Sequence, residues 1–232
     1  MMNILLCVYA LVAFASSSAD GSTIVTGAVP SVNASSEILP IRQNIENLQN
    51  TGPVWDLYIL ALRQFADGNE TDPLSYYQIS GNYSLSLDIL LLDYLTVLGI
   101  HGIPFQSWDE AFGDNNLGYC THNSILFGPW HRVYLALFEQ VLSSIAQEIA
   151  TTYPPGQRVT YEAAARALRI PYWDWANSSV LPNIATIPQI NIQGPSGSQT
   201  IQNPLYSYEF RSSTDFSSRF FVCLRVPYNQ SN

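Results

Sequence analysis

Apolar residues recur at helical spacing over much of the chain. Residues 51–68 predict one helix, with Pro53 in its opening turn and Gly68 at its end. Residues 85–98 are apolar on every side, which indicates a buried helix that stops at Gly99. The repeating apolar positions of the first helix are Trp55, Tyr58, Ile59, Leu62 and Phe65.

Two further helices are predicted after residue 128. An apolar stripe predicts a helix from about Pro129 to Thr152, which Pro154-Pro155-Gly156 ends. The alanine-rich stretch from Tyr161 to Arg169 predicts a shorter helix, with Thr160 as its N-cap and Pro171 beyond its end. The stripe consists of Trp130, Tyr134, Leu137, Phe138, Val141 and Ile145.

The remaining pattern predicts one hairpin and one long loop. The segments IPQINIQ and SQTIQ alternate polar and apolar residues around Gly194-Pro195-Ser196-Gly197, as the two strands of a β-hairpin do. Residues 102–127 have little periodicity, and loops of this length are usually functional or disordered. Their aromatic content indicates a packed loop. The expected fold is therefore mainly α, with a short β-hairpin on a helical body.

All three histidines fall within residues 101–142. His101 follows the predicted apolar helix, His122 lies two residues after Cys120 in the loop, and His131 falls in the first turn of the next helix. The positive end of a helix disfavours protonation there, and a metal needs a neutral imidazole. Three converging imidazoles would hold copper, zinc, iron or nickel, whereas each one taken alone is more often an ordinary histidine.

The residues around these histidines are more specific. The string GYCTHNSILFGPWHR, with HGIPF before it and IPYWDW at residues 170–175, resembles the first copper-binding half of the tyrosinases, the type-3 copper oxidases. The similarity is strongest to the fungal members, and NPLYSYEF at residues 203–210 extends it. The resemblance implies a partial helical-bundle copper domain. Its copper ligands would be His101, His122 and His131, and a thioether bond would join Cys120 to His122.

The resemblance also implies an activity that needs a second metal. The family uses two copper ions and O2 to oxidise monophenols and o-diphenols to o-quinones, the chemistry of phenolic pigments. Three more histidines would hold the second copper, but the sequence has three in all. We therefore expect a tyrosinase-like oxidoreductase truncated before its second site. The alternative is a secreted mononuclear copper-binding glycoprotein without oxidase activity, and pairing of two chains is a third, weaker reading.

These observations divide the chain into four parts. Residues 1–19 are expected to be a signal peptide, residues 20–48 a polar leader, residues 49–212 the first-copper half of the tyrosinase domain, and residues 213–232 a divergent or truncated tail. The apolar run near the N-terminus is too short to anchor the chain in a membrane. The alternative for residues 1–19 is a helix packed into the core.

Asparagine triplets agree with a secretory route. Five N-x-[ST] triplets lie in polar, turn-rich surroundings and are candidates for glycosylation, although each is weak evidence alone. Their asparagines are Asn33, Asn69, Asn82, Asn177 and Asn229. The expected location is extracellular.

Cys7 would leave with the signal peptide, so two cysteines remain. In an oxidising compartment a disulfide between Cys120 and Cys223 is the simple expectation. However, residues two apart on an extended segment point to the same side, so Cys120 also suits the thioether with His122. That bond would leave Cys223 unassigned.

Three residues near the proposed ligands have open roles. Arg132 is unfavourably placed in a first helical turn, and Asp174 of the WDW triplet is the candidate carboxylate that would compensate it. An arginine extended into solvent is the alternative. We expect Trp173 and Trp175 to pack in the core, because bulky aromatics bury large areas.

Charge excludes some classes of partner. The net charge is −9 and the sequence pI is about 4.5, and the nine basic residues are scattered arginines. Because no basic patch exists in the sequence, neither nucleic acid nor an anionic membrane is an expected partner. The expected partners are O2 and small phenols, and the sequence leaves the oligomeric state open.

Overall fold

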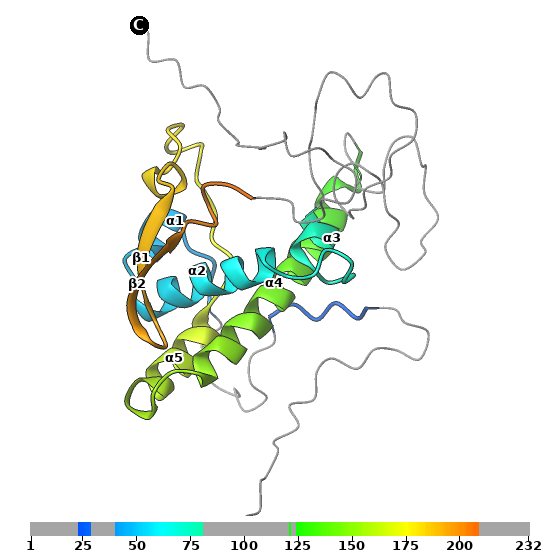
Figure 1. Cartoon of the computed structure of the whole chain (residues 1–232). Helices are drawn as coiled ribbons and strands as arrows, with labels where there is room; N and C mark the ends of the chain where they lie inside the picture. The colour runs from blue at the N-terminus through cyan, green and yellow to red at the C-terminus, as the bar shows by residue number, and fades with distance from the viewer. Residues whose placement is uncertain (1–22, 29–39, 81–120, 122–123, 209–232) are drawn as a thin grey trace, which may run out of the picture.

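Three helices form the body of the molecule in a computed structural model, which describes residues 23–28, 40–80, 121 and 124–208 (Figure 1). The predicted mainly helical fold with a short hairpin is confirmed. The elements are α1 (Ile45–Leu48), α2 (Pro53–Ala66), α3 (Tyr76–Ser80), α4 (Phe127–Thr151), α5 (Pro155–Ala167), the 3-10 helix η3 (Asn183–Ala185), β1 (Gln189–Gly194) and β2 (Gly197–Gln202). The predicted helix at residues 85–98 and most of the loop at 102–127 lie outside the described residues.

The prediction for α2 is confirmed. Pro53 occupies the first turn, where a missing backbone N–H costs nothing, and Gly52 adopts a φ of 62° that favours glycine. All five residues of its predicted apolar stripe are buried. This side of α2 packs against α4 and α5, so the core lies where the three helices meet.

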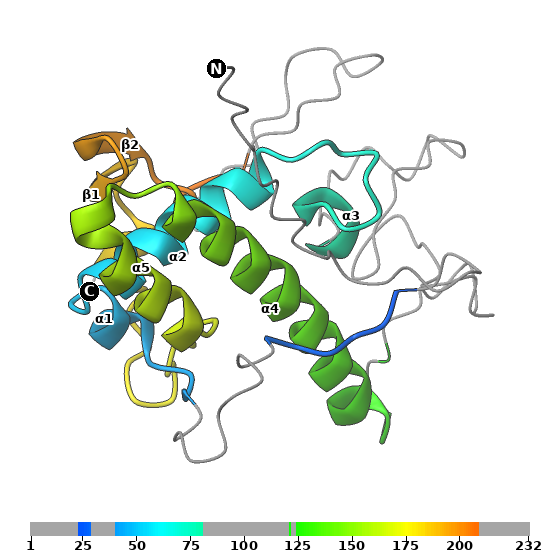
Figure 2. The ribbon, with the colours of Figure 1, turned by 90° about the horizontal axis from the view of Figure 1, so that it is seen from below.

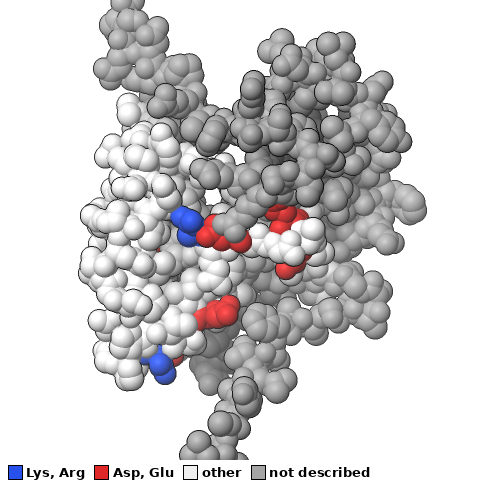
Figure 3. Space-filling view, viewed as in Figure 1, with Lys and Arg blue, Asp and Glu red and all other residues white. Residues whose placement is uncertain are grey.

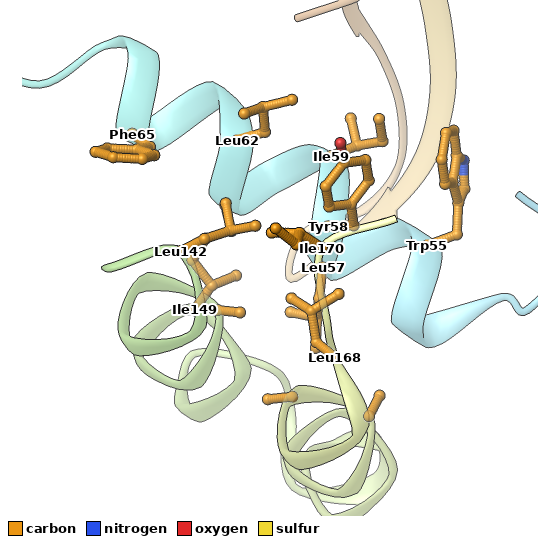
Figure 4. Close-up of a cluster of buried hydrophobic side chains, with 14 of the residues drawn as sticks. Trp55, Leu57, Tyr58, Ile59, Leu62, Phe65, Leu142, Ile149, Leu168 and Ile170 are labelled. Carbon is orange, nitrogen blue, oxygen red and sulfur yellow. The ribbon is translucent and has the colours of Figure 1, made fainter. Parts of the chain in front are cut away.

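Side chains from α2, α4 and the segment after α5 interdigitate in this core (Figure 4). Leu57 and Ile59 are fully buried, and Leu142 and Leu168 are each only 1% exposed. Phe65 on α2 packs against Phe138 on α4 with ring centroids 5.2 Å apart. Burial of each such side chain contributes roughly 1.5–3 kcal/mol, so this cluster is the main source of stability in the described part.

α4 begins two residues earlier than predicted. Ser124 closes the turn that leads into the helix: its hydroxyl accepts the Leu126 N–H at 3.1 Å, and its carbonyl accepts the Phe127 N–H at 3.1 Å. Pro129 then falls inside the first turn, where N–H groups lack partners within the helix, so proline is tolerated there. His131 consequently lies in the second turn rather than the first.

The predicted start of α5 was wrong by six residues. Pro155 is its first residue, and Pro154 precedes it in an extended conformation. The Pro-Pro-Gly segment ends the preceding helix as predicted, but proline also suits the first position of a new one. Thr160 therefore lies inside α5 and is not its cap.

The hairpin prediction is confirmed. β1 and β2 pair antiparallel, with Ile190 opposite Ile201 and Gly194 opposite Gly197. Ile190 and Ile192 are buried while Gln189, Asn191 and Gln193 are exposed, as the alternation predicted. In Figure 1 the hairpin lies at one edge of the helical body, beside α2.

Candidate metal centre

Of the four residues predicted to form the copper site, the structure describes one. His101, Cys120 and His122 lie outside the described residues, so their convergence stays a prediction. His131 lies on α4, near the end of that helix that is farther from α5 and the hairpin (Figure 2).

The His131 ring has a fixed tautomer. Its Nδ1 lies 2.7 Å from the carbonyl oxygen of Phe127, four residues earlier on the same helix. Because a carbonyl oxygen only accepts, Nδ1 must carry the hydrogen, and the lone pair of the neutral ring is on Nε2. Histidines that bind metals commonly donate their second N–H to a carbonyl or carboxylate in this way, which orients the ring.

Aromatic rings surround this imidazole. The centroid of the Phe127 ring is 4.2 Å away, that of Trp130 4.8 Å, and that of Tyr134 6.5 Å. Trp130 and Tyr134 stack on one another with an interplanar angle of 15°. The Nε2 atom itself is buried. The ring is thus packed among aromatic side chains that keep water from its Nε2 atom.

The start of α4 carries exposed apolar surface. Ile125 is 95% exposed, and Leu126, Phe127 and Val133 are each about half exposed. The opposite end of α4 is covered by α2 and α5.

Two polar contacts hold α4 to the rest of the described chain, and neither was predicted from the sequence. Glu139 accepts hydrogen bonds from Arg42 Nε and from the backbone N–H of Ile170, each at 3.0 Å. It thereby joins α4 to the segments before α1 and after α5. The sequence does hold one signal for this contact. Glu139 is an acidic residue on the predicted apolar side of the helix, three positions before Leu142, and a buried carboxylate needs hydrogen-bond partners.

The second contact ties the N-terminal segment to α4. The Gln140 side chain accepts the Thr26 N–H at 2.7 Å and the Gly27 N–H at 3.2 Å, and donates to the Ile24 carbonyl at 3.3 Å. Residues 23–28 lie along α4 in Figure 2. Nothing in the sequence indicated this docking, because it depends on the path of the chain between residues 28 and 40.

Arg132 lies on α4, and Asp174 lies in the surface turn that follows Trp173. Arg132 is exposed, and Asp174 Oδ1 accepts the Asn177 N–H at 3.2 Å. The ion pairs between described residues are Arg42 with Glu139 and Arg63 with Asp67, and the predicted pair of Arg132 with Asp174 is not one of them. The face seen in Figure 3 is largely uncharged over its described part.

The expectation that Trp173 and Trp175 pack in the core was wrong. Trp173 is 38% exposed and Trp175 is 71% exposed. After α5 the buried core takes in Leu168 and Ile170, and the backbone of Tyr172 still pairs with the segment before α1. The chain then enters a surface turn, which carries both tryptophans. Size alone therefore misled the prediction for these two aromatics.

Within the described residues, no group of three or more His, Cys, Asp or Glu side chains is placed to hold a metal ion. His131 nonetheless fits copper: its donor atom is an imidazole nitrogen, its tautomer is fixed and its surroundings are apolar. None of the described helices has the length and apolar character needed to cross a membrane.

Comparison with known proteins identifies the family. Residues 92–230 match the family model described as the common central domain of tyrosinase. The match includes all three histidines and extends into the segment 213–232, which we expected to diverge.

Curated relatives agree. Tyrosinase from Podospora anserina is 35% identical over 90% of this chain and 37% of its own length, and tyrosinase from Neurospora crassa is 35% identical over 90% of this chain and 32% of its own. Polyphenol oxidase 4 from Agaricus bisporus is 34% identical over 66% of this chain and 23% of its own. The chain thus spans about a third of the length of the first two relatives.

Solved structures give the same answer. A structure of latent and active mushroom tyrosinase superposes with a TM-score of 0.63 at 29% identity, covering 81% of this chain and 45% of that one. An oxygen-bound pro-tyrosinase variant of Aspergillus oryzae superposes with a TM-score of 0.66 at 28% identity, covering 82% of this chain and 34% of that one. On these matches, together with the setting of His131 on α4, the chain belongs to the tyrosinase family of copper oxidoreductases.

Proposed function

We propose that this chain is the first-copper part of a tyrosinase-type oxidase, which uses O2 to convert monophenols or o-diphenols to o-quinones. The proposed ligands of one copper ion are His101, His122 and His131, with Cys120 joined to His122 by a thioether bond. The observation that carries the proposal is the hydrogen bond from His131 Nδ1 to the Phe127 carbonyl at 2.7 Å. It leaves Nε2 as the donor atom of a ring that is already oriented.

The residues around His131 suit this role. The helix fixes Phe127 and His131 one turn apart, so the ring is held without help from the loop. Phe127, Trp130 and Tyr134 surround the imidazole and reduce the access of water. Copper, when bound, supplies the electron transfer and O2 chemistry that protein side chains lack.

The number of histidines limits what these residues do alone. The 232 residues contain three, the number that one copper of the family uses. A second candidate function follows from the same count: a secreted, mononuclear copper-binding glycoprotein without oxidase activity. Its secretion would depend on residues 1–19 acting as a signal peptide.

Oxygen uptake with L-DOPA tests the catalytic part of the proposal. The purified chain is loaded with copper, its sequence is verified by mass, and O2 consumption and quinone formation are recorded together. We expect no sustained turnover, because one copper cannot replace two. Sustained O2-dependent quinone formation that a copper chelator abolishes would contradict this expectation.

The physical state of the protein separates the two candidates. A monomer that holds one copper tightly, and whose copper does not cycle with ascorbate and O2, supports the copper-binding glycoprotein. A copper-free chain that aggregates, and that copper keeps in solution, supports the first-copper part of an oxidase. The apolar surface exposed at the start of α4 would be the surface through which such chains associate.

A further inference from the structure

Residues 172–181, which we call the aromatic loop, expose an unusual amount of apolar surface. Trp175 is 71% exposed, Val180 63%, Tyr172 50% and Leu181 43%. Single exposed apolar side chains need no explanation, but a cluster within ten consecutive positions usually marks a surface that something covers. The question is what covers it.

The aromatic loop has a defined conformation. Trp173 Nε1 donates to the Ser178 carbonyl at 3.2 Å, which closes the loop on itself. The Asp174 carbonyl accepts the Asn177 N–H at 3.1 Å and the Ser178 N–H at 2.9 Å. Trp175 and Asn177 are therefore held together in one tight turn.

A glycosylation triplet lies inside this turn. Asn177, Ser178 and Ser179 form an N-x-S triplet, and Asn177 is exposed. Two residue steps separate Asn177 from Trp175, so their Cα atoms are at most about 7 Å apart. A sugar attached to Asn177 is within reach of the exposed indole.

We propose that Asn177 carries an N-linked glycan whose first sugar packs on Trp175 and covers the aromatic loop. The proposal rests on secretion of the chain but not on copper binding or oxidase activity. The face of a pyranose ring presents C–H groups, which pack on an aromatic face as other apolar groups do. The glycan also makes a hydrophobic turn soluble.

The modification is an ordinary glycosyl transfer. The side-chain nitrogen of Asn177 forms a bond to the anomeric carbon of a lipid-linked oligosaccharide, supplied with its transferase by the secretory pathway. The bond between that carbon and the pyrophosphate oxygen breaks, lipid pyrophosphate leaves, and the amide nitrogen loses one proton. No oxidant or reductant is needed.

The chain contains a matched control. Asn69 is exposed and heads another triplet, and its side-chain oxygen accepts hydrogen bonds from the Thr71 N–H at 3.1 Å and the Thr71 hydroxyl at 3.0 Å. The residue two positions before Asn69 is Asp67, which has no ring for a sugar to pack on. Of the five triplets, the one at Asn177 alone has an aromatic residue at that position.

Occupancy is tested first. The full chain is secreted from a yeast host and cleaved after arginine, which isolates Asn177 in the peptide of residues 170–211. We expect this peptide to carry an N-glycan that an amidase removes, and Ser179→Ala to abolish it. A secreted protein that is glycosylated at Asn69 but bare at Asn177 overturns the proposal. A chain bare at every triplet overturns the secretory route as well.

Contact between the sugar and Trp175 is tested next, by thermal unfolding of four proteins. These are the parent chain, Ser179→Ala, Trp175→Ala, and the double variant. We expect Ser179→Ala to lower the Tm by about 2–4 °C in the parent and to have no effect once Trp175 is alanine. Thr71→Ala, which removes the triplet at Asn69, should change the Tm equally whether residue 175 is tryptophan or alanine. Trimming the glycan to its first sugar should preserve the parent Tm.

Two results would overturn the contact. One is an equal effect of Ser179→Ala with and without the indole, which would show that the glycan acts independently of Trp175. The other is a secreted dimer that Trp175→Ala converts to a monomer, which would show that a second copy covers the aromatic loop. Size-exclusion chromatography of the same four proteins measures this.

Discussion

At the scale of single residues, a buried carboxylate joins the helices to the hairpin. Asp56, on the apolar face of α2, accepts the Tyr161 hydroxyl at 3.0 Å and the backbone N–H of Gln193 at 3.0 Å. Tyr153 stacks on Tyr161 with centroids 3.5 Å apart and donates to the Gln193 carbonyl at 2.7 Å. Burial, and then the Asp56 charge, raises the pKa of Tyr161 from 10.0 to about 12.

This raised pKa predicts a loss of stability in alkali. The folded state keeps the Tyr161 proton to a higher pH than the unfolded state does, so its contribution is complete below pH 10.0 and declines as the pH rises towards about 12. Denaturant unfolding is measured from about pH 7 to about pH 12. Between pH 10.0 and about 12 the stability of Tyr161→Phe should fall less steeply than that of the parent, and at lower pH the two should fall equally. Equal slopes across the whole range would contradict the assignment.

At the scale of elements, α4 divides into an anchored part and a projecting part. Leu142, Ala146 and Ala150 are buried against α2 and α5, whereas Ile125 and Phe127 at its start are exposed. Glu139 and Gln140 fix the helix between these two parts. The position of His131 is therefore set by the buried Leu137 and the two polar contacts, and by Trp130 and Tyr134, which pack against the core cluster.

Two leucines on α4 test this division. Leu142 is 1% exposed and Leu135 is 37% exposed. Leu142→Ala should lower the free energy of unfolding by about 2–5 kcal/mol, because it leaves a cavity between three helices. Leu135→Ala removes the same atoms from a partly exposed site and should cost well under half of that, about 1 kcal/mol or less. Similar losses in urea unfolding would contradict the packing described here.

The success of the sequence predictions followed the range of the interactions involved. Periodicity located α2 and the hairpin because both bury one face whose spacing is local. It misplaced the start of α5, since Pro155 suits either a helix end or a helix beginning. Asp56, Glu139 and Gln140 could not be predicted with their partners, because those partners lie 31 to 137 positions away along the chain.

For the metal site, sequence and structure contribute different parts. The spacing of Cys120, His122 and His131, with the aromatic residues around them, indicates the tyrosinase family from the sequence alone. The family matches confirm this. The tautomer of His131 required the structure, because it depends on where the Phe127 carbonyl lies. The error at Trp173 and Trp175 came from judging burial by side-chain size.

At the scale of the whole molecule, the fold separates stability from chemistry. The buried core lies among α2, α4, α5 and the hairpin, while His131 lies where α4 extends beyond α5 (Figure 2). On the proposed function, a metal bound at that end would stabilise the folded chain by linkage, without contributing to the core. Copper should therefore raise the Tm of the parent chain and leave that of His131→Ala unchanged.

The most direct test of the account is the number of copper ions bound per chain. The metal-free protein is incubated with excess copper, separated from free metal, and analysed for copper and protein, in parallel with His131→Ala and the control Leu135→Ala. We predict about one copper for the parent and the control, and a marked loss for His131→Ala with unchanged helical circular dichroism. Copper uptake by His131→Ala equal to that of the parent would contradict the central claim that His131 is a ligand.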